Sequence, residues 1–399
     1  MRFTRAVIPL GFAWSSPFAR WQGPLSELSS VDLAVDVTGR ALAERGLAAD
    51  EATHWVLGTT VPQATSFYGV TTITRRLGAP AATGPTIAQA CATSAACLQA
   101  AAAQVELGVH DLAMALLSDR TSNGPTMLWP SPSRMGGAPT IEHWVLDPMV
   151  SDPTTGQSML DTAENVAEQG GFSRQEIDDL TMLRHEQYAA ALAHDRAVQR
   201  RYLVPVHVPG SGRRGGTVVP ADVGVHCTTA EGLAKLAPLK PGGVVTYGSQ
   251  THPADGTAGL VVTSEGRGRE LSGGRGVARV LAVAFARVEP AAMPKALVPA
   301  ALAALGDAGI DLAGIQVVTT HNPFAVNDLW FSQQTGYQLE RMNPYGCSLV
   351  YGHPQGPTGA RAITELIVAL EERGGGRGLF TGCAAGDTAG AVVVEVTDR

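Results

Sequence analysis

Four side chains capable of nucleophilic or acid–base chemistry stand beside small, turn-forming residues in this sequence. They are Cys91, His321, His353 and Cys383. A thiolate can accept an acyl group from a thioester, and an imidazole can remove the proton of the thiol. A second acid–base group can move the proton of an α-carbon, while imidazole N–H groups stabilise the enolate oxygen that forms there. Together, these residue types predict carbon–carbon bond chemistry on a thioester.

The segment around Cys91 is typical of a strand-to-helix junction. Residues 85–90 predict a short strand, and the Ala-rich run at 95–107 predicts a helix that ends at Gly108. A thiol at the start of a helix lies over the positive end of its dipole. We therefore expect the pKa of Cys91 to be lower, by about 1 unit or more, than its usual value of about 8.5. This segment alone would fit a buried structural cysteine better than a catalytic one.

Two parts of the sequence follow the same order of elements. The first contains a strand at 55–58, Cys91, the helix at 95–107 and a strand at 112–117; the second contains a strand at 315–320, His321, His353, a helix at 358–373, a strand at 378–381 and Cys383. A strand, a reactive residue, a helix, a glycine stop and another strand recur in each part. This order predicts a duplicated α/β unit whose functional residues meet between the two halves.

Residues 120–250 differ from the two flanking parts in the elements that their sequence predicts. The segments 129–133 and 210–216 are rich in turn formers and predict loops. The capping box Ser173-Arg-Gln-Glu176 predicts the start of a long helix that runs to about Arg201. This region is interpreted as an insert over the core, placed where a substrate lid or cofactor cradle would lie. An insert that mediates oligomerisation, or one that has no role in the site, fits this pattern equally well.

The composition describes a well-buried α/β protein of two or three domains. The chain has 399 residues, of which 45% are apolar and 16% are charged, and its net charge is −7. That charge argues against nucleic acid or an anionic membrane as a partner. No apolar run reaches the roughly 20 residues needed to span a bilayer, and the N-terminal segment is expected to form a first strand.

The five cysteines are sparse and form no Cys-x-x-Cys pair, so we expect a reducing, cytoplasmic location without a disulfide framework. We also expect no metal site, because His226-Cys227 lacks partners at ligand spacing. The eight histidines outside the reactive set are interpreted as ordinary polar residues.

The order of motifs resembles the thiolase family over nearly the whole chain. The motifs that carry the resemblance are Thr162-Ala-Glu-Asn-Val-Ala167 followed by Ser173-Arg-Gln-Glu176, the segment 233–246, Asp255-Gly256-Thr-Ala258, Gly352-His-Pro-Gln-Gly356 and the late Cys383. Locally, Cys91-Ala-Thr-Ser-Ala95 looks more like a β-ketoacyl synthase, but those enzymes share neither the Thr-Ala-Glu-Asn stretch nor a late cysteine. The resemblance implies a thiolase-like α/β fold in five αβαβα layers. Its two similar halves would be residues 1–119 and 251–399, with residues 120–250 as an inserted loop domain.

The resemblance also implies a role for each reactive residue. Cys91 would be the acylated nucleophile, His353 the base that activates it, and Cys383 the group that moves the α-proton. His321, in His321-Asn-Pro-Phe324, stands where the family usually has Asn-Glu-Ala-Phe, and it would join His353 in binding the enolate oxygen. The backbone N–H of Cys91 and one from the turn 384–386 would form a second oxyanion hole.

Coenzyme A is implied as a substrate, with no permanently bound cofactor. It would lie under the insert, along a pantetheine-contacting loop at 247–256 that includes Ser249 and Thr251, and beside Met159. Candidate partners for its phosphates are Arg213, Arg214 and Lys235. The family resemblance further suggests a homodimer or homotetramer.

The predicted function is therefore that of an acyl-CoA C-acyltransferase. It would cleave a 3-oxoacyl-CoA with CoA, or run the reverse Claisen condensation, through an acyl-Cys91 intermediate. Two alternatives remain: a biosynthetic condensing or acyl-transfer enzyme with an unusual acceptor, and a thiolase-like subunit that works only with an accessory protein. Asp119, in Leu116-Leu-Ser-Asp119, replaces the end of the family's Gly-Gly-Met-Glu motif, and Ser158 stands where many members have histidine. These departures suggest an acyl pocket unlike that of the common acetoacetyl enzymes.

Overall fold

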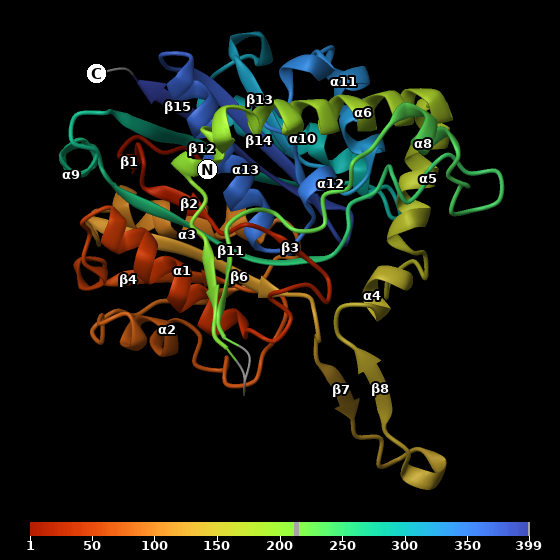
Figure 1. The fold of residues 1–399 in the computed structure, drawn as a ribbon, viewed down its shortest axis with the longest axis horizontal. Helices are drawn as coiled ribbons and strands as arrows, with labels where there is room; N and C mark the ends of the chain where they lie inside the picture. The colour runs from red at the N-terminus through yellow and green to blue at the C-terminus, as the bar shows by residue number, and fades with distance from the viewer. Residues whose placement is uncertain (211–214, 398–399) are drawn as a thin grey trace.

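Two equivalent α/β units form the body of the protein, which a computed structural model describes for residues 1–210 and 215–397 (Figure 1). The first unit contains β1 (Ala6–Pro9), α1 (Ser30–Glu44), β4 (His54–Gly58), α3 (Thr93–Glu106), β6 (Leu112–Arg120) and β11 (Ala254–Ser264). The second contains β12 (Val277–Arg287), α10 (Leu297–Ala308), β13 (Val317–His321), α13 (Pro357–Glu372), β14 (Gly376–Ala384) and β15 (Thr388–Thr397). In each unit a helix joins two parallel strands, and the next strand pairs antiparallel. This is the duplicated α/β unit that the sequence predicted.

Hydrogen bonding joins the strands of both units into one continuous path. The 11-stranded sheet follows the order β13-β14-β15-β12-β1-β11-β6-β4-β5, in which β5 is Thr86–Ile87. Strands β2 (Ala13–Ser15) and β3 (Ala19–Arg20) pair with β11 beside this path. Strand β1 connects the two units because it pairs with β11 on one side and with β12 on the other.

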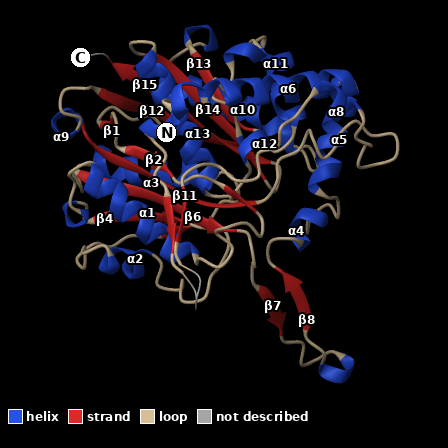
Figure 2. Cartoon of the chain, in the orientation of Figure 1, coloured by secondary structure: helices blue, strands red, loops and turns tan. Residues whose placement is uncertain are grey.

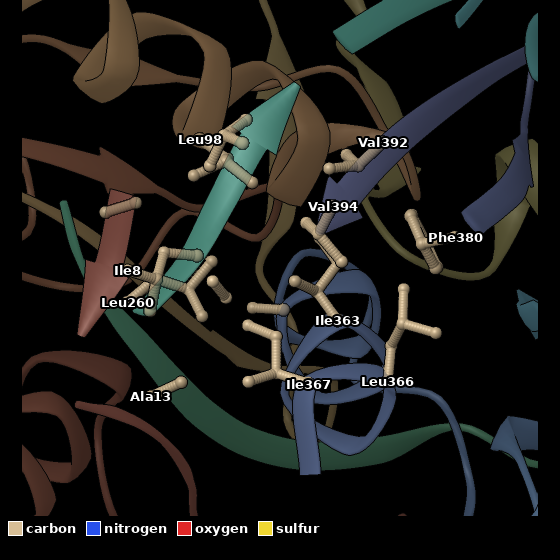
Figure 3. Close-up of a cluster of buried hydrophobic side chains, with 14 of the residues drawn as sticks. Ile8, Ala13, Leu98, Leu260, Ile363, Leu366, Ile367, Phe380, Val392 and Val394 are labelled. Atoms are coloured by element: carbon tan, nitrogen blue, oxygen red, sulfur yellow. The ribbon is translucent and has the colours of Figure 1, made fainter. Parts of the chain in front are cut away.

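Helices lie between and outside the two parts of the sheet (Figures 1 and 2). Helices α3 and α13 pack against each other and against strands of both units, while α1 covers the outer face of β6 and β11 and α10 covers that of β12 and β15. The five αβαβα layers predicted from the sequence are thus present. Figure 3 shows part of the central core, where Leu98, Ile363 and Val392 lie among other buried apolar side chains.

The region between β6 and β11 forms the insert. It contains β7 (Thr126–Trp129), β8 (Thr140–His143), α4 (Asp147–Val150), α5 (Met159–Gly170), α6 (Arg174–Ala191), α7 (Ala193–Arg196), β9 (Val206–Val208), β10 (Thr217–Val219) and α8 (Ala230–Ala234). Strands β7 and β8 form a hairpin that projects away from the body (Figure 1). Beyond the insert, the remaining helices are α2 (Val70–Arg76), α9 (Glu265–Leu271), α11 (Ala325–Thr335) and α12 (Ser348–Tyr351).

Two boundaries predicted from the sequence need correction, the end of a helix and the start of the second half. The capping box at Ser173 starts α6 as predicted, but the helix ends at Ala191 and not near Arg201, because His194 and Asp195 adopt positive φ values. The predicted start of the second half at residue 251 separates β11 from β6. These two strands pair from Asp255–Arg120 to Thr263–Leu112, so β11 belongs with the first unit.

No helix within residues 1–210 and 215–397 is both long and apolar enough to cross a lipid bilayer.

The first turns of α3 and α13 meet between the two units. Ser94 Oγ donates to the carbonyl of Gly356 at 2.5 Å and accepts from the N–H of Ala360 at 2.7 Å. A Cβ at Gly359 would lie 2.8 Å from Cβ of Ser94, which is closer than packed carbons approach. Only glycine therefore allows the two helix starts to meet at this distance.

We predict that Gly359→Ala pushes the two helix starts apart. Overpacking at this contact should cost about 1–3 kcal/mol in the free energy of unfolding, measured by urea denaturation. A misplacement of about 1 Å at the reactive groups should lower the rate of the acyl transfer predicted from the sequence by about 100-fold. Gly306→Ala is the matched control, because an added Cβ at this helical glycine meets nothing within 4 Å. The control should be neutral or stabilised by up to about 1 kcal/mol; equal effects of the two substitutions would contradict the prediction.

Candidate active site

Cys91 lies in a tight turn between β5 and α3. The predicted strand at 85–90 is shorter than expected, since β5 covers only Thr86–Ile87. Ala90 has a φ of 44°, and Thr93 Oγ1 closes the turn by accepting from the N–H of Gln89 at 2.8 Å and donating to the carbonyl of Ala90 at 2.6 Å. Helix α3 starts at Thr93, two positions after the cysteine. The turn thus presents the thiol to the space between the two units.

His353 is the nearest imidazole to this thiol. Its Nε2 lies 3.1 Å from Cys91 Sγ, and its Nδ1 lies 2.6 Å from Thr358 Oγ1 in the first turn of α13. If Nδ1 donates to Thr358, Nε2 carries a lone pair that faces the thiol proton. We assign this tautomer, in which His353 is placed to act as the base for Cys91.

Gln355 is a second neighbour of the thiol that the sequence reasoning missed. Cys91 Sγ lies 3.3 Å from its Oε1, an alternative acceptor for the thiol proton, and the amide side chain also interacts with His353. Gln355 has a φ of 62°, a backbone conformation that is uncommon outside glycine. The side chain therefore touches both the candidate nucleophile and the candidate base.

His321 stacks directly on His353. The ring centroids are 4.0 Å apart and the planes are inclined by 25°. Ser348 Oγ lies 2.9 Å from His321 Nδ1 and 3.5 Å from Asn322 Oδ1, and it accepts from the N–H of Asn322 at 3.3 Å. We assign its hydroxyl proton to the shorter contact, with Nδ1. The ring proton then resides on Nε2, which is buried and has no hydrogen-bond partner in the structure. An unpartnered, buried N–H donor beside a thiol is suited to hold a developing oxyanion.

Cys383 lies close to His321 because Gly382 pairs with His321 across β14 and β13. Its Sγ accepts from Asn327 Nδ2 at 3.2 Å, and the side chain is fully buried. Burial raises the pKa of Cys383 well above its usual value, and the negative charge of a Cys91 thiolate would raise it further. Cys383 is therefore a protonated thiol that can donate a proton.

Burial also controls the protonation of Cys91 and His353. It raises the pKa of the Cys91 thiol to about 12, although the backbone N–H groups of Ala385 and of Cys91 itself point to the sulfur and lower it. Burial lowers the pKa of His353 to about 3 and that of His321 well below its usual value. The lowered pKa of Cys91 expected from its place at a helix start is therefore wrong: removal of the thiolate from water outweighs the helix dipole. At rest, the pair is a neutral thiol and a neutral imidazole.

The two N–H groups that face the Cys91 sulfur are those expected to form a second oxyanion hole. One belongs to Cys91 and the other to Ala385, in the turn after Cys383. A carbonyl oxygen on a carbon attached to this sulfur would lie near both donors.

Asp119 is a buried carboxylate that joins the two units behind the thiol. It accepts from the N–H groups of Thr60, Val61 and Gly356 at 2.8, 3.0 and 2.9 Å, and from the hydroxyl of Thr59 at 2.9 Å. Burial raises its pKa to about 6 despite these donors. Since Gly356 follows Gln355, Asp119 holds the loop that carries Gln355 and His353 against the first unit.

A cavity of about 400 Å³ opens onto Cys91, His353, Gln355 and Ala385. Of the residues expected to contact CoA, Thr251 and Met159 line this cavity. Ser249 does not: it is buried, and its Oγ accepts from the N–H of Thr246 at 2.9 Å within the loop. Lys235 is exposed after the end of α8, and Arg213 and Arg214 lie outside the described residues.

A second cavity of about 350 Å³ borders the loop at 247–252. It is lined by His185, His226, Cys227 and His252, among others, and it shares Gln250 with the first cavity. The sequence reasoning treated these histidines as ordinary polar residues. Burial lowers the pKa of His185 to about 4 and also lowers that of His252, so both are neutral near pH 7.

The ligand atoms of Cys91, His321 and His353 lie within 4.8 Å of one another, which is close enough for one metal ion. A thiolate and two imidazoles are ligands that Zn²⁺ accepts. The same three groups also suit metal-free acyl transfer.

Sequence reasoning missed Gln355, Ser348, Thr358 and Asn327, which contact the four reactive side chains. Gln355 stood within a quoted motif, between His353 and Gly356, and its polar side chain in that position was the one available signal. The other three carry no local signal, because their contacts form only when the chain folds.

We predict that alkylation of Cys91 by iodoacetamide accelerates steadily with pH. Because the pKa of the thiol is raised to about 12, the thiolate fraction should rise about tenfold per pH unit from about pH 6 to pH 9, without a plateau. The measurement is the rate of mass gain on the peptide that contains Cys91, with Cys91→Ser as the control. A rate that levels off below about pH 7 would instead indicate a thiolate–imidazolium pair at rest.

Comparisons with known proteins agree with this geometry. Family models for the thiolase N-terminal and C-terminal domains match residues 12–266 and 275–396. The acetyl-CoA acetyltransferase of Syntrophomonas wolfei is 28% identical over 98% of this chain and 99% of its own length. The β-ketoadipyl-CoA thiolase of Pseudomonas knackmussii is 30% identical over 95% of this chain and 96% of its own length.

Solved structures agree as well. The crystal structure of the Bacillus anthracis acetyl-CoA acetyltransferase has a TM-score of 0.90 and 28% identity, and 99% of each chain is covered. Human mitochondrial 3-ketoacyl-CoA thiolase in complex with CoA has the same TM-score at 23% identity, covering 100% of this chain and 99% of its own, and shares the fold. The prediction made from the order of motifs is confirmed, and the chain belongs to the thiolase family.

Proposed function

We propose that the protein cleaves a 3-oxoacyl-CoA with CoA, or runs the reverse Claisen condensation, through an acyl group carried on Cys91. The observation that carries this proposal is the stack of two neutral imidazoles beside the thiol. His353 Nε2 lies 3.1 Å from Cys91 Sγ, and His321 presents an unpartnered Nε2 from the same stack. A base for the thiol and a donor for an oxyanion are both in place before any substrate binds.

In the first half-reaction, His353 takes the proton of the Cys91 thiol as the sulfur attacks the 3-oxo carbon of the substrate. The N–H groups of Cys91 and Ala385 hold the oxygen of the resulting tetrahedral adduct. The bond between C2 and C3 then breaks, and its electron pair forms the enolate of the departing acyl-CoA. His321 and His353 donate to the enolate oxygen, and the thiol of Cys383 protonates C2.

In the second half-reaction, the thiolate of Cys383 takes the proton of an incoming CoA thiol. The CoA thiolate attacks the acyl carbon on Cys91, a new thioester forms, and the Cys91 thiolate leaves. His353 then returns the proton to Cys91, so both cysteines end as thiols. The protons thus move between Cys91, His353, Cys383 and the substrates, and the protein groups end in their starting state.

Coenzyme A is the second substrate, and its pantetheine arm would reach Cys91 through the cavity lined by Thr251 and Met159. The cavity on the other side of the loop at 247–252 offers space for more of the molecule. Phosphate contacts by Arg213 and Arg214 remain predictions. The cytoplasmic location and the homodimer or homotetramer expected from the sequence also remain predictions.

The alternatives drawn from the sequence are less well supported. The named relatives are acetyl-CoA acetyltransferases and thiolases, which do not favour a condensing enzyme with an unusual acceptor. Retention of all four reactive side chains in one arrangement argues against a purely structural subunit. The experiment that tests the activity also tests whether an accessory protein is required.

The proposal predicts cleavage of at least one member of a panel of 3-oxoacyl-CoA thioesters by purified protein and CoA. Mass spectrometry should detect an acyl adduct on Cys91 when CoA is withheld after the first half-reaction. Cys91→Ser should abolish both the cleavage and the adduct. Cys383→Ala should still allow slow transfer of an acyl group from a simple acyl-CoA to Cys91, while carbon–carbon cleavage is lost. A wild-type protein that neither cleaves any thioester nor becomes acylated would refute the proposal.

A further prediction concerns the enolate donor. His321→Ala should lower kcat by about 100-fold to 1,000-fold, which corresponds to roughly 2.7–4 kcal/mol of lost transition-state stabilisation. His321→Asn, which restores the residue most family members carry, should recover part of this loss because an amide can hold a water in place of the ring. Both variants are compared with wild type in kcat and KM. Activity of His321→Ala within a few-fold of wild type would remove this residue from the site.

A further inference from the structure

We infer that the acyl group carried on Cys91 is an uncharged, apolar chain longer than acetyl. This inference rests on the proposed function and deepens it, because it names the class of substrate. It is drawn from the walls of the cavity that opens onto Cys91, which the acyl group on the sulfur would share with the end of the pantetheine arm.

No charged side chain lines that cavity within the described part of the chain. Its walls include the apolar side chains of Val145, Leu146, Met149, Val150, Met159 and Met293. Two of the polar groups on the walls are already used by the protein: Ser158 Oγ caps α5 through the N–H of Asp161, and Thr251 Oγ1 donates to the carbonyl of Ser348. Apart from His353, which is neutral at rest, the walls therefore offer no cation to a negatively charged acyl end.

The segment that leads into α4 exposes apolar side chains at this cavity. Leu146 is 40% exposed and Val150 is 69% exposed, although both are cavity-lining residues. A ligand that covers apolar surface of this kind is stabilised, because the surface is removed from water. An apolar acyl chain attached to Cys91 could cover these side chains, whereas an acetyl group is too short to cover much of their surface.

The volume and the residue types also favour a longer chain. The cavity measures about 400 Å³, whereas a cavity of about 150 Å³ is enough to hold benzene. The cavity is therefore large enough for a group bigger than acetyl. Three of the wall residues are methionines, Met149, Met159 and Met293, whose unbranched side chains adapt to ligands of different shape.

A carboxylate at the end of the acyl chain is disfavoured by the same walls. Transfer of an ionised carboxylate from water to an apolar site without a partner costs several kcal/mol. The Pseudomonas knackmussii relative is named for β-ketoadipyl-CoA, an acyl group that ends in a carboxylate, and it is about as similar in sequence as the acetyl-CoA acetyltransferases. Overall identity therefore does not separate these substrate classes, whereas the cavity walls do.

The test compares kcat/KM for acetoacetyl-CoA, 3-oxohexanoyl-CoA, 3-oxooctanoyl-CoA and 3-oxoadipyl-CoA. The second and fourth form a matched pair, because they leave a methyl-ended and a carboxylate-ended acyl group of similar length on Cys91. Each methylene added beyond acetyl should raise kcat/KM by about fourfold until the chain fills the cavity. The methyl-ended member of the pair should exceed the carboxylate-ended member by at least about 100-fold.

A charge-introducing variant tests whether these walls are responsible. Leu146→Lys places a cation at the cavity and should raise the ratio of 3-oxoadipyl-CoA to 3-oxohexanoyl-CoA use by at least about tenfold. Leu128→Lys is the control, because Leu128 is an equally simple exposed leucine, 63% exposed on the β7–β8 hairpin and absent from the cavity. The control should leave the ratio unchanged.

The outcomes separate this inference from the function on which it rests. A preference for acetoacetyl-CoA, or equal use of the matched pair, would overturn the inference while leaving the acyltransferase activity established. Absence of cleavage and of Cys91 acylation with every thioester would overturn the proposed function itself. Binding of hexanoyl-CoA and acetyl-CoA to Cys91→Ser provides a readout without chemistry, and the inference requires the tighter binding of hexanoyl-CoA.

Discussion

The contact between the first turns of α3 and α13 is the constraint on which the candidate site depends. Each helix follows a reactive residue: Cys91 precedes α3 and His353 precedes α13. The contact of Ser94 with Gly356, Gly359 and Ala360 holds the two helix starts together, and Asp119 ties the same loop to the first unit from behind. The distance of 3.1 Å between Cys91 Sγ and His353 Nε2 is a consequence of this packing. A duplicated unit becomes a functional site here because its two copies meet at equivalent positions.

Much of the fold and of the site is predictable from the sequence, and the limits have physical causes. The strands at 54–58 and 317–321 and the helices α3 and α13 follow from apolar runs, alanine content and glycine stops, which are local properties. Cys91, His353 and Cys383 stand in motifs whose order along the chain is informative. The partners Ser348, Thr358 and Asn327 are not predictable in this way, because each meets its imidazole or thiol across a tertiary contact. Strand β11 was misplaced for the same reason, since its pairing with β6 joins residues far apart in the sequence.

The pKa of Cys91 illustrates how a local rule fails when its surroundings are unknown. The start of a helix does lower the pKa of a nearby thiol, and the N–H groups of Cys91 and Ala385 act in that direction here. The sequence does not reveal that the sulfur is buried beside Gln355 and His353. Burial therefore dominates, and the nucleophile is formed only when His353 takes the proton. Near neutral pH the thiolate is therefore scarce until His353 takes the proton.

The stacking of His321 on His353 has a consequence for the charge of the site as a whole. Two imidazolium rings with centroids 4.0 Å apart would repel each other by about 4 kcal/mol even at an effective dielectric constant of about 20. When His353 becomes positive, His321 is held all the more firmly in its neutral form. The two rings together can therefore accept only one proton beyond those of their neutral forms. Whenever they hold that proton, a thiolate, the oxygen of the adduct or an enolate nearby bears the matching negative charge. Anionic chemistry can therefore proceed next to apolar walls, because the sum of the charges there remains zero throughout the reaction.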